Sequence, residues 1–135
     1  MKTRPLFSLL AILITALIAI GCSRTDPVQN IDNAPITVTS GKNYTLTDVR
    51  NAIVRAGVGL GWQMQDVAPG HLVGTLNIRS HMAQVDIKYN TKAYSITYRD
   101  SSNLNYDGTK IHSNYNGWIQ NLNSKIMAQL SGIGA

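Results

Sequence analysis

Apolar and polar side chains alternate along much of the chain between residues 62 and 99. Such alternation predicts β-strands with one buried face, and the short connections between the repeats favour an antiparallel meander. Four strands are expected, at about residues 62–67, 72–79, 83–89 and 94–99. The apolar positions predicted to face the core are Leu72, Gly74, Leu76, Ile78, Ala83, Val85, Ile87, Tyr89, Tyr94, Ile96 and Tyr98.

Helical periodicity flanks the predicted strands on both sides. The first apolar stripe follows a weak capping box formed by Thr45 and Asp48 and ends near Gly61. The second stripe predicts a helix over about residues 113–130, with Ser113 as its cap. The stripes consist of Leu46, Val49, Ile53, Ala56 and Leu60, and of Ile111, Tyr115, Ile119, Leu122, Ile126 and Leu130. The sequence therefore predicts an α+β two-layer sandwich of order α-β-β-β-β-α, with both helices packed on one face of the sheet.

The region before the first predicted helix is polar and lacks helical periodicity. Residues 22–43 contain Pro27, Pro35 and Gly41, which is typical of a flexible tether with an rms span of roughly 25 Å. Within it, residues 35–39 are the one candidate for a short edge strand, because proline is tolerated at such a position. Residues 44–135 are thus expected to form the folded domain.

The N-terminus has the pattern of an export signal. Lys2 and Arg4 precede an apolar run over residues 6–20, interrupted only by Ser8 and Thr15. As a helix this run is roughly 22 Å long, which is shorter than the roughly 30 Å hydrocarbon core of a bilayer. A signal peptide over residues 1–21 is the better interpretation.

The segment Ala19-Ile20-Gly21-Cys22 resembles the lipobox of bacterial lipoproteins, although leucine is more usual at position 19. The resemblance implies cleavage before Cys22, acylation of its thiol and stable attachment through two or three acyl chains. Ser23 stands where aspartate favours retention in the inner membrane, which implies an outer-membrane protein facing the periplasm. The alternative is that Cys22 is an ordinary thiol after a cleavage site.

The segment His112-Ser113-Asn114-Tyr115-Asn116-Gly117-Trp118 is the most distinctive part of the chain. Together with residues 94–98 and 104–106, it resembles a family of small uncharacterised bacterial outer-membrane lipoproteins. The resemblance covers about residues 44–130 and implies a lipid-anchored envelope protein, but it carries no activity over to this chain.

The charge balance argues against nucleic-acid binding. Without Lys2 and Arg4, the mature chain has ten basic and seven acidic residues, a net charge of +3, and no dense basic cluster. Nucleic-acid binding normally needs such a cluster. The expected partners are the membrane, through the lipid, and another envelope protein or peptidoglycan.

No pattern of catalytic or metal-binding residues stands out. His71, His81 and His112 are too far apart in the predicted topology to converge on a metal, so no metal or cofactor is expected. No nucleophile motif is present, and Asp86 is best interpreted as a cross-strand ion pair near Lys88 and Arg99, with a general base as the alternative. We therefore expect a protein that is not an enzyme.

The glycines of the segment Gly57-x-Gly59-x-Gly61 have a structural interpretation. The segment lacks the strand that precedes a phosphate-binding loop, so it is predicted to be a helix end. Gly57 and Gly59 are expected to allow this helix to pack closely against the sheet.

Two surfaces are candidates for binding. The first is a groove lined by Tyr106, His112, Asn114 and Trp118, residues that could instead fix the helix start and the core. The second is the polar face of the sheet, which could instead be merely solvated. Its predicted members are Arg79, Lys88 and Arg99, with Thr75, Asn77, Gln84 and Thr97. The sequence favours a non-catalytic binding or envelope-structural module, with a periplasmic cell-wall or ester hydrolase, or an inhibitor of one, as the alternative.

The lipid prediction is tested by Cys22→Ser. Because the hydroxyl cannot take the place of the acylated thiol, this variant should lose acyl labelling and remain uncut in cells. Gel mobility and mass spectrometry of the envelope fraction measure both effects. Normal processing of the variant would overturn the assignment as a lipoprotein.

Overall fold

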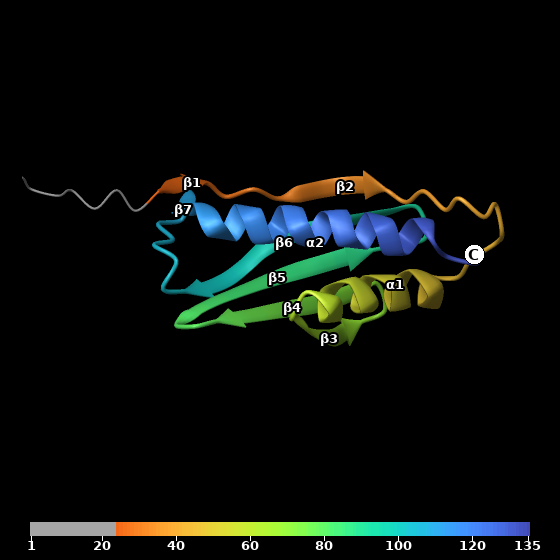
Figure 1. The fold of residues 1–135 in the computed structure, drawn as a ribbon, viewed down its shortest axis with the longest axis horizontal. Helices are drawn as coiled ribbons and strands as arrows, with labels where there is room; N and C mark the ends of the chain where they lie inside the picture. The colour runs from red at the N-terminus through yellow and green to blue at the C-terminus, as the bar shows by residue number, and fades with distance from the viewer. Residues whose placement is uncertain (1–23) are drawn as a thin grey trace, which may run out of the picture.

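The computed structural model describes residues 24–135, so the predicted signal segment and Cys22 lie outside the described residues. The described chain forms seven strands and two helices (Figure 1). In chain order they are β1 (Thr25–Pro27), β2 (Ile31–Pro35), α1 (Leu46–Gly59), β3 (Gln63–Ala68), β4 (His71–Ile78), β5 (His81–Tyr89), β6 (Ala93–Ser102), β7 (Lys110–His112) and α2 (Ser113–Ser131).

The α+β class is confirmed, and so is the antiparallel meander formed by β3, β4, β5 and β6. The predicted element order was incomplete, because β2 adds a fifth strand beside β6 and gives the order β2-β6-β5-β4-β3. A second, two-stranded sheet joins β1 to β7. Both helices cover the same face of the five-stranded sheet, with α2 lying along β6 and β5 and α1 along β4 and β3 (Figure 1).

The prediction of a flexible tether over residues 22–43 was wrong for its described part. Two strands form there, and the strand beside β6 occupies Ile31–Pro35 rather than residues 35–39. Further bonds hold the segment in place: Val28 N donates to Thr109 O at 3.0 Å, and Ile36 N donates to Lys92 O at 2.9 Å. The physical reason is that the free edge of β6 presents unpaired backbone groups, which β2 satisfies.

Helix α2 clamps the connection between β1 and β2 through the side-chain amide of Asn116. Its Oδ1 accepts a hydrogen bond from Gln29 N at 2.9 Å, and its Nδ2 donates to Pro27 O at 2.9 Å. The amide therefore pairs with the main chain on both sides of Val28. Gln120 adds a bond of 3.0 Å from its Nε2 to Oε1 of Gln29.

The core lies between the helices and the inner face of the sheet. Its fully buried members include Val49, Ala52, Ile53 and Ala56 from α1, Leu72, Ala83, Val85, Ile87 and Ile96 from the sheet, and Tyr115, Ile119, Leu122 and Ile126 from α2.

Close packing at Gly57 is confirmed, because a Cβ there would lie 2.6 Å from the Met64 sulfur. At Gly59 the nearest atom would be 3.9 Å away, so no close approach requires that glycine. Within residues 24–135, no helix is both long and apolar enough to cross a bilayer.

The helix caps were predicted correctly for α1 and wrongly for α2. Thr45 and Asp48 form the expected reciprocal capping box, with bonds of 2.8 and 3.2 Å. In α2 the cap is His112, whose Nδ1 accepts a hydrogen bond from Asn114 N at 3.1 Å, and Ser113 is the first helical residue. An extended backbone at His112 (φ −51°, ψ 132°) places the imidazole over the free amides of the first turn.

Helix α2 is tested by Ile119→Asp, which places an unpaired charge at a fully buried position. The variant should unfold, because such a charge costs several kcal/mol, a large share of the stability of a domain this small. The control is Gln120→Asp, one residue along on the exposed side of the helix, which should melt within a few degrees of the parent. Equal melting of Ile119→Asp and the parent by circular dichroism would show that this helix face is misplaced.

Candidate functional site

Within residues 24–135, both helices lie on one face of the five-stranded sheet and no element covers the other, which we call the open face (Figure 1). The register aligns its side chains in rows across β3 to β6, with Gln65, Val73, Asp86 and Thr97 forming one row. The open face consists of Gln63, Gln65, His71, Val73, Thr75, Asn77, Met82, Gln84, Asp86, Lys88, Ser95, Thr97, Asp100 and Ser102, and Arg99 joins it from the bulge in β6 by bonding Asp86. It includes Lys88 and Arg99, two of the three basic residues predicted for it.

Arg79, the third, does not lie on the open face. It occupies a two-residue turn between the paired residues Ile78 and His81, with a φ of 55°. A side chain other than glycine in this left-handed region costs about 1–2 kcal/mol. No sequence pattern indicates this conformation, because arginine is not a residue typical of such turns.

Asp86 is the centre of a polar network on the open face. Its Oδ1 lies 2.6 Å from His71 Nε2 and accepts a hydrogen bond from Arg99 Nη1 at 2.9 Å. The predicted ion pair with Arg99 is confirmed, but His71 replaces Lys88 as the second partner. His71 lies opposite Lys88 on the neighbouring strand, which makes it a diagonal neighbour of Asp86 within reach of a long side chain.

The two partners fix the charge of Asp86. Partial burial raises the pKa of this carboxyl, but the hydrogen bonds from His71 and Arg99 outweigh burial and hold its pKa below the usual value. The carboxylate is therefore ionised at neutral pH. A fully formed catalytic triad would also need a nucleophile at the other ring nitrogen of His71. Among residues 24–135, no serine, threonine or cysteine side chain hydrogen-bonds His71.

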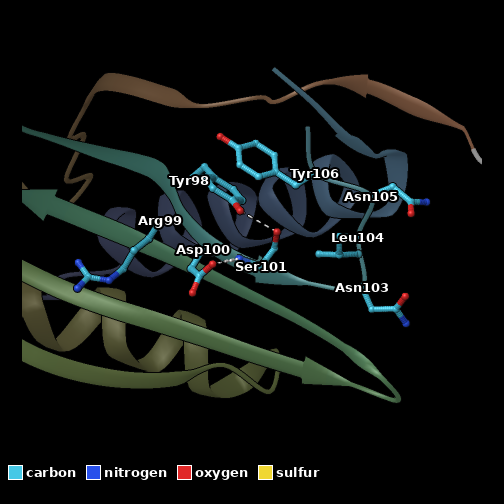
Figure 2. A pocket seen from close by; sticks show the side chains of 8 residues that line it. All are labelled: Tyr98, Arg99, Asp100, Ser101, Asn103, Leu104, Asn105 and Tyr106. Atoms are coloured by element: carbon cyan, nitrogen blue, oxygen red, sulfur yellow. Dashed lines mark hydrogen bonds between the residues drawn. The ribbon is translucent and has the colours of Figure 1, made fainter. Parts of the chain in front are cut away.

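A hollow of about 560 Å³ lies where β6 continues beyond its partner β2. It is lined by Tyr98, Arg99, Asp100, Ser101, Asn103, Leu104, Asn105 and Tyr106 (Figure 2). The ring of Tyr106 stacks on that of Tyr98 at 4.1 Å, and the Tyr98 and Ser101 hydroxyls share a hydrogen bond of 2.7 Å. The hollow is continuous with the open face through Arg99, which belongs to both.

The groove predicted from Tyr106, His112, Asn114 and Trp118 does not form as one hollow among the described residues. Tyr106 lines the hollow on β6, whereas Trp118 lines a separate one of about 220 Å³ with Leu60, Trp62, Leu76, Ile78 and Asn121. His112 and Asn114 meet at the cap of α2 instead. The His81 ring lies 6.5 Å from the rings of both His112 and Trp118, a grouping that sequence analysis missed.

Tyr115 is a core aromatic, as its place in the apolar stripe of the second predicted helix indicates. Its ring is fully buried and meets the edge of Tyr98 at 5.8 Å, but its hydroxyl has no hydrogen-bond partner. Burial raises the pKa of this phenol. Tyr94 is the opposite case, because its buried hydroxyl donates to Asn123 Oδ1 at 2.6 Å, and burial raises its pKa to about 12.

The described residues contain no group of three histidine, cysteine or carboxylate side chains placed to hold a metal ion. Comparisons of the chain with protein-family models, curated proteins and solved structures give no match. The site must therefore be interpreted from its own chemistry.

The Asp86 network predicts an acid-dependent part of the stability. Because the folded-state pKa of Asp86 is lowered, its stabilisation is present above the unfolded value near 3.9 and is lost as pH falls through the folded value. Asp86→Asn should lower the free energy of unfolding by about 0.5–1 kcal/mol at pH 6 and much less at pH 3. Urea unfolding at both pH values measures this, with the exposed Asp32→Asn as control. A deficit of equal size at both pH values would contradict this account.

The two buried tyrosines make a matched pair of variants. Tyr115→Phe removes an unsatisfied hydroxyl without changing shape, so it should raise the free energy of unfolding by up to about 1 kcal/mol. Tyr94→Phe removes a satisfied hydroxyl and should lower it by about 1 kcal/mol. Destabilisation by Tyr115→Phe would mean that its hydroxyl has a partner in solution.

Proposed function

We propose that the chain is a lipid-anchored module of the bacterial cell envelope that binds peptidoglycan on its open face and in the adjoining hollow, without catalysing a reaction. The anchor is Cys22, and the lipobox-like segment before it supports acylation and export. Ser23 and the resemblance to small outer-membrane lipoproteins favour the outer membrane, with the domain facing the periplasm. The single observation that carries the binding proposal is a sheet face left uncovered and built almost wholly of polar side chains.

The composition of the open face suits a hydrated polymer. More than half of its members are uncharged donors and acceptors, namely Gln63, Gln65, Thr75, Asn77, Gln84, Ser95, Thr97 and Ser102. Peptidoglycan presents hydroxyls, amides and carboxylates, which such groups bind directly or through water. Lys88 adds positive charge for the carboxylates. Arg99 pairs with Asp86 through Nη1, so it offsets the charge of that carboxylate, and Asp100 is the second acidic member of the face.

The same composition makes a protein partner the weaker candidate. The buried centres of protein interfaces are enriched in aromatic and other apolar side chains. On the open face the apolar members are Val73 and Met82, and Val73 is only 6% exposed. A partner recognised here therefore gains its affinity mainly from hydrogen bonds and charge.

The hollow on β6 supplies the aromatic surface that the open face lacks. The Tyr106 ring stacks on Tyr98 and is 41% exposed, so its exposed part could pack against the C–H face of a sugar ring. Asp100, Asn103 and Asn105 line the same hollow and add hydrogen-bonding groups to it. This combination of an aromatic plate and a polar rim suits a glycan better than a lipid tail.

A hydrolase is the alternative, and the short contact between His71 and Asp86 is the observation that favours it. Covalent catalysis would also need a nucleophilic hydroxyl at this imidazole, and the hydrogen bonds within residues 24–135 bring none to it. Binding is therefore the better-supported proposal.

Co-sedimentation with purified peptidoglycan sacculi tests the proposal. Lys88→Gln combined with Arg99→Gln should weaken binding of the mature protein at least about tenfold, since two charge-assisted hydrogen bonds are lost. The matched control, Lys92→Gln with Lys125→Gln, makes the same charge change away from the open face and should bind like the parent. Circular dichroism melts establish that all variants are folded.

Three results would contradict the proposal. If both double variants bound sacculi equally weakly, the attraction would be non-specific charge attraction. If neither bound more weakly than the parent, the open face would not be the binding surface. Release of soluble fragments from the sacculi, abolished by His71→Ala, would show a hydrolase instead.

A further inference from the structure

The fold begins almost at the predicted lipid attachment point. Arg24 O accepts a hydrogen bond from Ser113 N at 2.9 Å, and Thr25 is already paired with His112 in the two-stranded sheet. Only Ser23 separates Cys22 from Arg24 in the chain. Two residues span at most about 7 Å, so acyl chains on Cys22 would bring this end of the domain to the bilayer surface.

Several segments meet at this end, which we call the anchor end and define as Arg24, residues 78–81 and residues 103–112. Asn103 joins two of them, since its Nδ2 donates to Ser80 Oγ at 2.8 Å and its carbonyl oxygen lies 2.6 Å from His81 Nδ1. His112 N donates to Leu104 O at 2.8 Å. In Figure 1 the β4–β5 turn and the β1–β7 pair lie at one end of the molecule and the C-terminus at the other.

The anchor end carries three exposed cations that form no salt bridge among the described residues, although the backbone amide and the charge of Lys110 help to lower the pKa of the nearby Asp107 carboxyl. Arg24, Arg79 and Lys110 are exposed, and none of them takes part in an ion pair among the described residues. The acidic groups nearby are Asp26, beside Arg24 in the chain, and Asp107, whose Oδ1 accepts the amides of Thr109 and Lys110 at 2.8 and 2.6 Å. His81, His112 and the half-exposed Tyr106 complete this surface.

Arg79 is the informative member of the set. It sits at the tip of the β4–β5 hairpin in a left-handed conformation that glycine or asparagine adopts with less strain. Positions where a sequence departs from the best local choice often serve function. Here the departure places a positive charge at the outermost point of the anchor end.

We propose that the anchor end lies against the bilayer that holds the acyl chains, with Arg24, Arg79 and Lys110 on anionic phospholipid headgroups. This inference rests on the proposed acylation of Cys22. Because the strands run from the anchor end to the opposite end of the molecule (Figure 1), the open face then stands upright beneath the membrane. It would face the periplasmic space from the side, not lie flat on the lipid.

Headgroup-level quenching tests this orientation with the full acylated protein. Cys22 is acylated, so a cysteine introduced at Thr109 (anchor end) or at Thr91 (β5–β6 turn, opposite end) takes a fluorescent label specifically. The protein is reconstituted in vesicles of phosphatidylethanolamine and phosphatidylglycerol that contain a nitroxide-headgroup lipid. We expect strong quenching at Thr109 and weak quenching at Thr91.

Charge variants then test the cause. Arg79→Gly and Lys110→Gln should each lower the ratio of docked to undocked protein about fivefold, and Lys92→Gln at the opposite end should not. Arg79→Gly should also raise the melting temperature, so reduced quenching in this variant cannot come from unfolding. Vesicles of phosphatidylcholine alone should give the same loss of quenching as the charge variants.

The outcomes separate this inference from the anchoring on which it rests. Protein that does not float with the vesicles has no lipid anchor, which overturns both proposals. Protein that floats but is quenched equally at Thr109 and Thr91 keeps its anchor and overturns the orientation. Unchanged quenching in the charge variants overturns the role of the cations.

Discussion

The pairing of the N-terminal segment with the rest of the domain is the constraint on which the other features depend. β2 covers the free edge of β6, β1 pairs with β7, and Asn116 holds the connection between them at its two flanking peptide groups. Side chains of this segment, including Val28, Ile31 and Ile36, pack against the core. Because of these contacts, the segment that the sequence predicts to be a flexible tether is part of the folded domain. They also fix the position of Arg24.

The same pairing determines where the hollow on β6 and the lipid anchor lie relative to the open face. β2 stops short of the end of β6, and the uncovered part of that edge is where the hollow with Tyr98 and Tyr106 lies. The described chain begins at β1, which lies beside the start of α2. The position of the predicted lipid anchor relative to the open face is therefore defined by the fold. A long flexible tether would have left the domain free to present any surface to the membrane.

The features predicted from sequence are those encoded by local periodicity. Alternation identified the four strands of the meander and most of their buried positions, and three- and four-residue spacings identified both helices. Ile78 and Leu60, which were predicted to face the core, are exposed because each lies at the end of its element. β1 and β2 were not predicted, because Thr25–Pro27 and Ile31–Pro35 are short, polar and rich in turn-forming residues. They are strands because β7 and β6 lie beside them, and partners so distant in sequence leave no local signal.

The candidate site was predicted in part for the same reason. Lys88 and Arg99 were placed on the open face by alternation alone, but the partnership of His71 with Asp86 depends on strand register. A two-residue turn at residues 79–80 fixes that register, so this contact was within reach of sequence reasoning. Sequence reasoning could not place Tyr106 and Trp118 in separate hollows. Their positions depend on the loop after β6 and on how α2 packs on the sheet.

Native-state hydrogen exchange of the N-terminal segment tests the central claim most directly. The amides of Val28 and Ile36 donate to Thr109 and Lys92, so they should exchange nearly as slowly as those of the central strand β5. Replacing the clamp by Asn116→Ala should speed exchange at residues 27–31 while leaving β5 protected. Exchange of residues 24–36 at the rate of an unstructured chain in the parent protein would contradict the account.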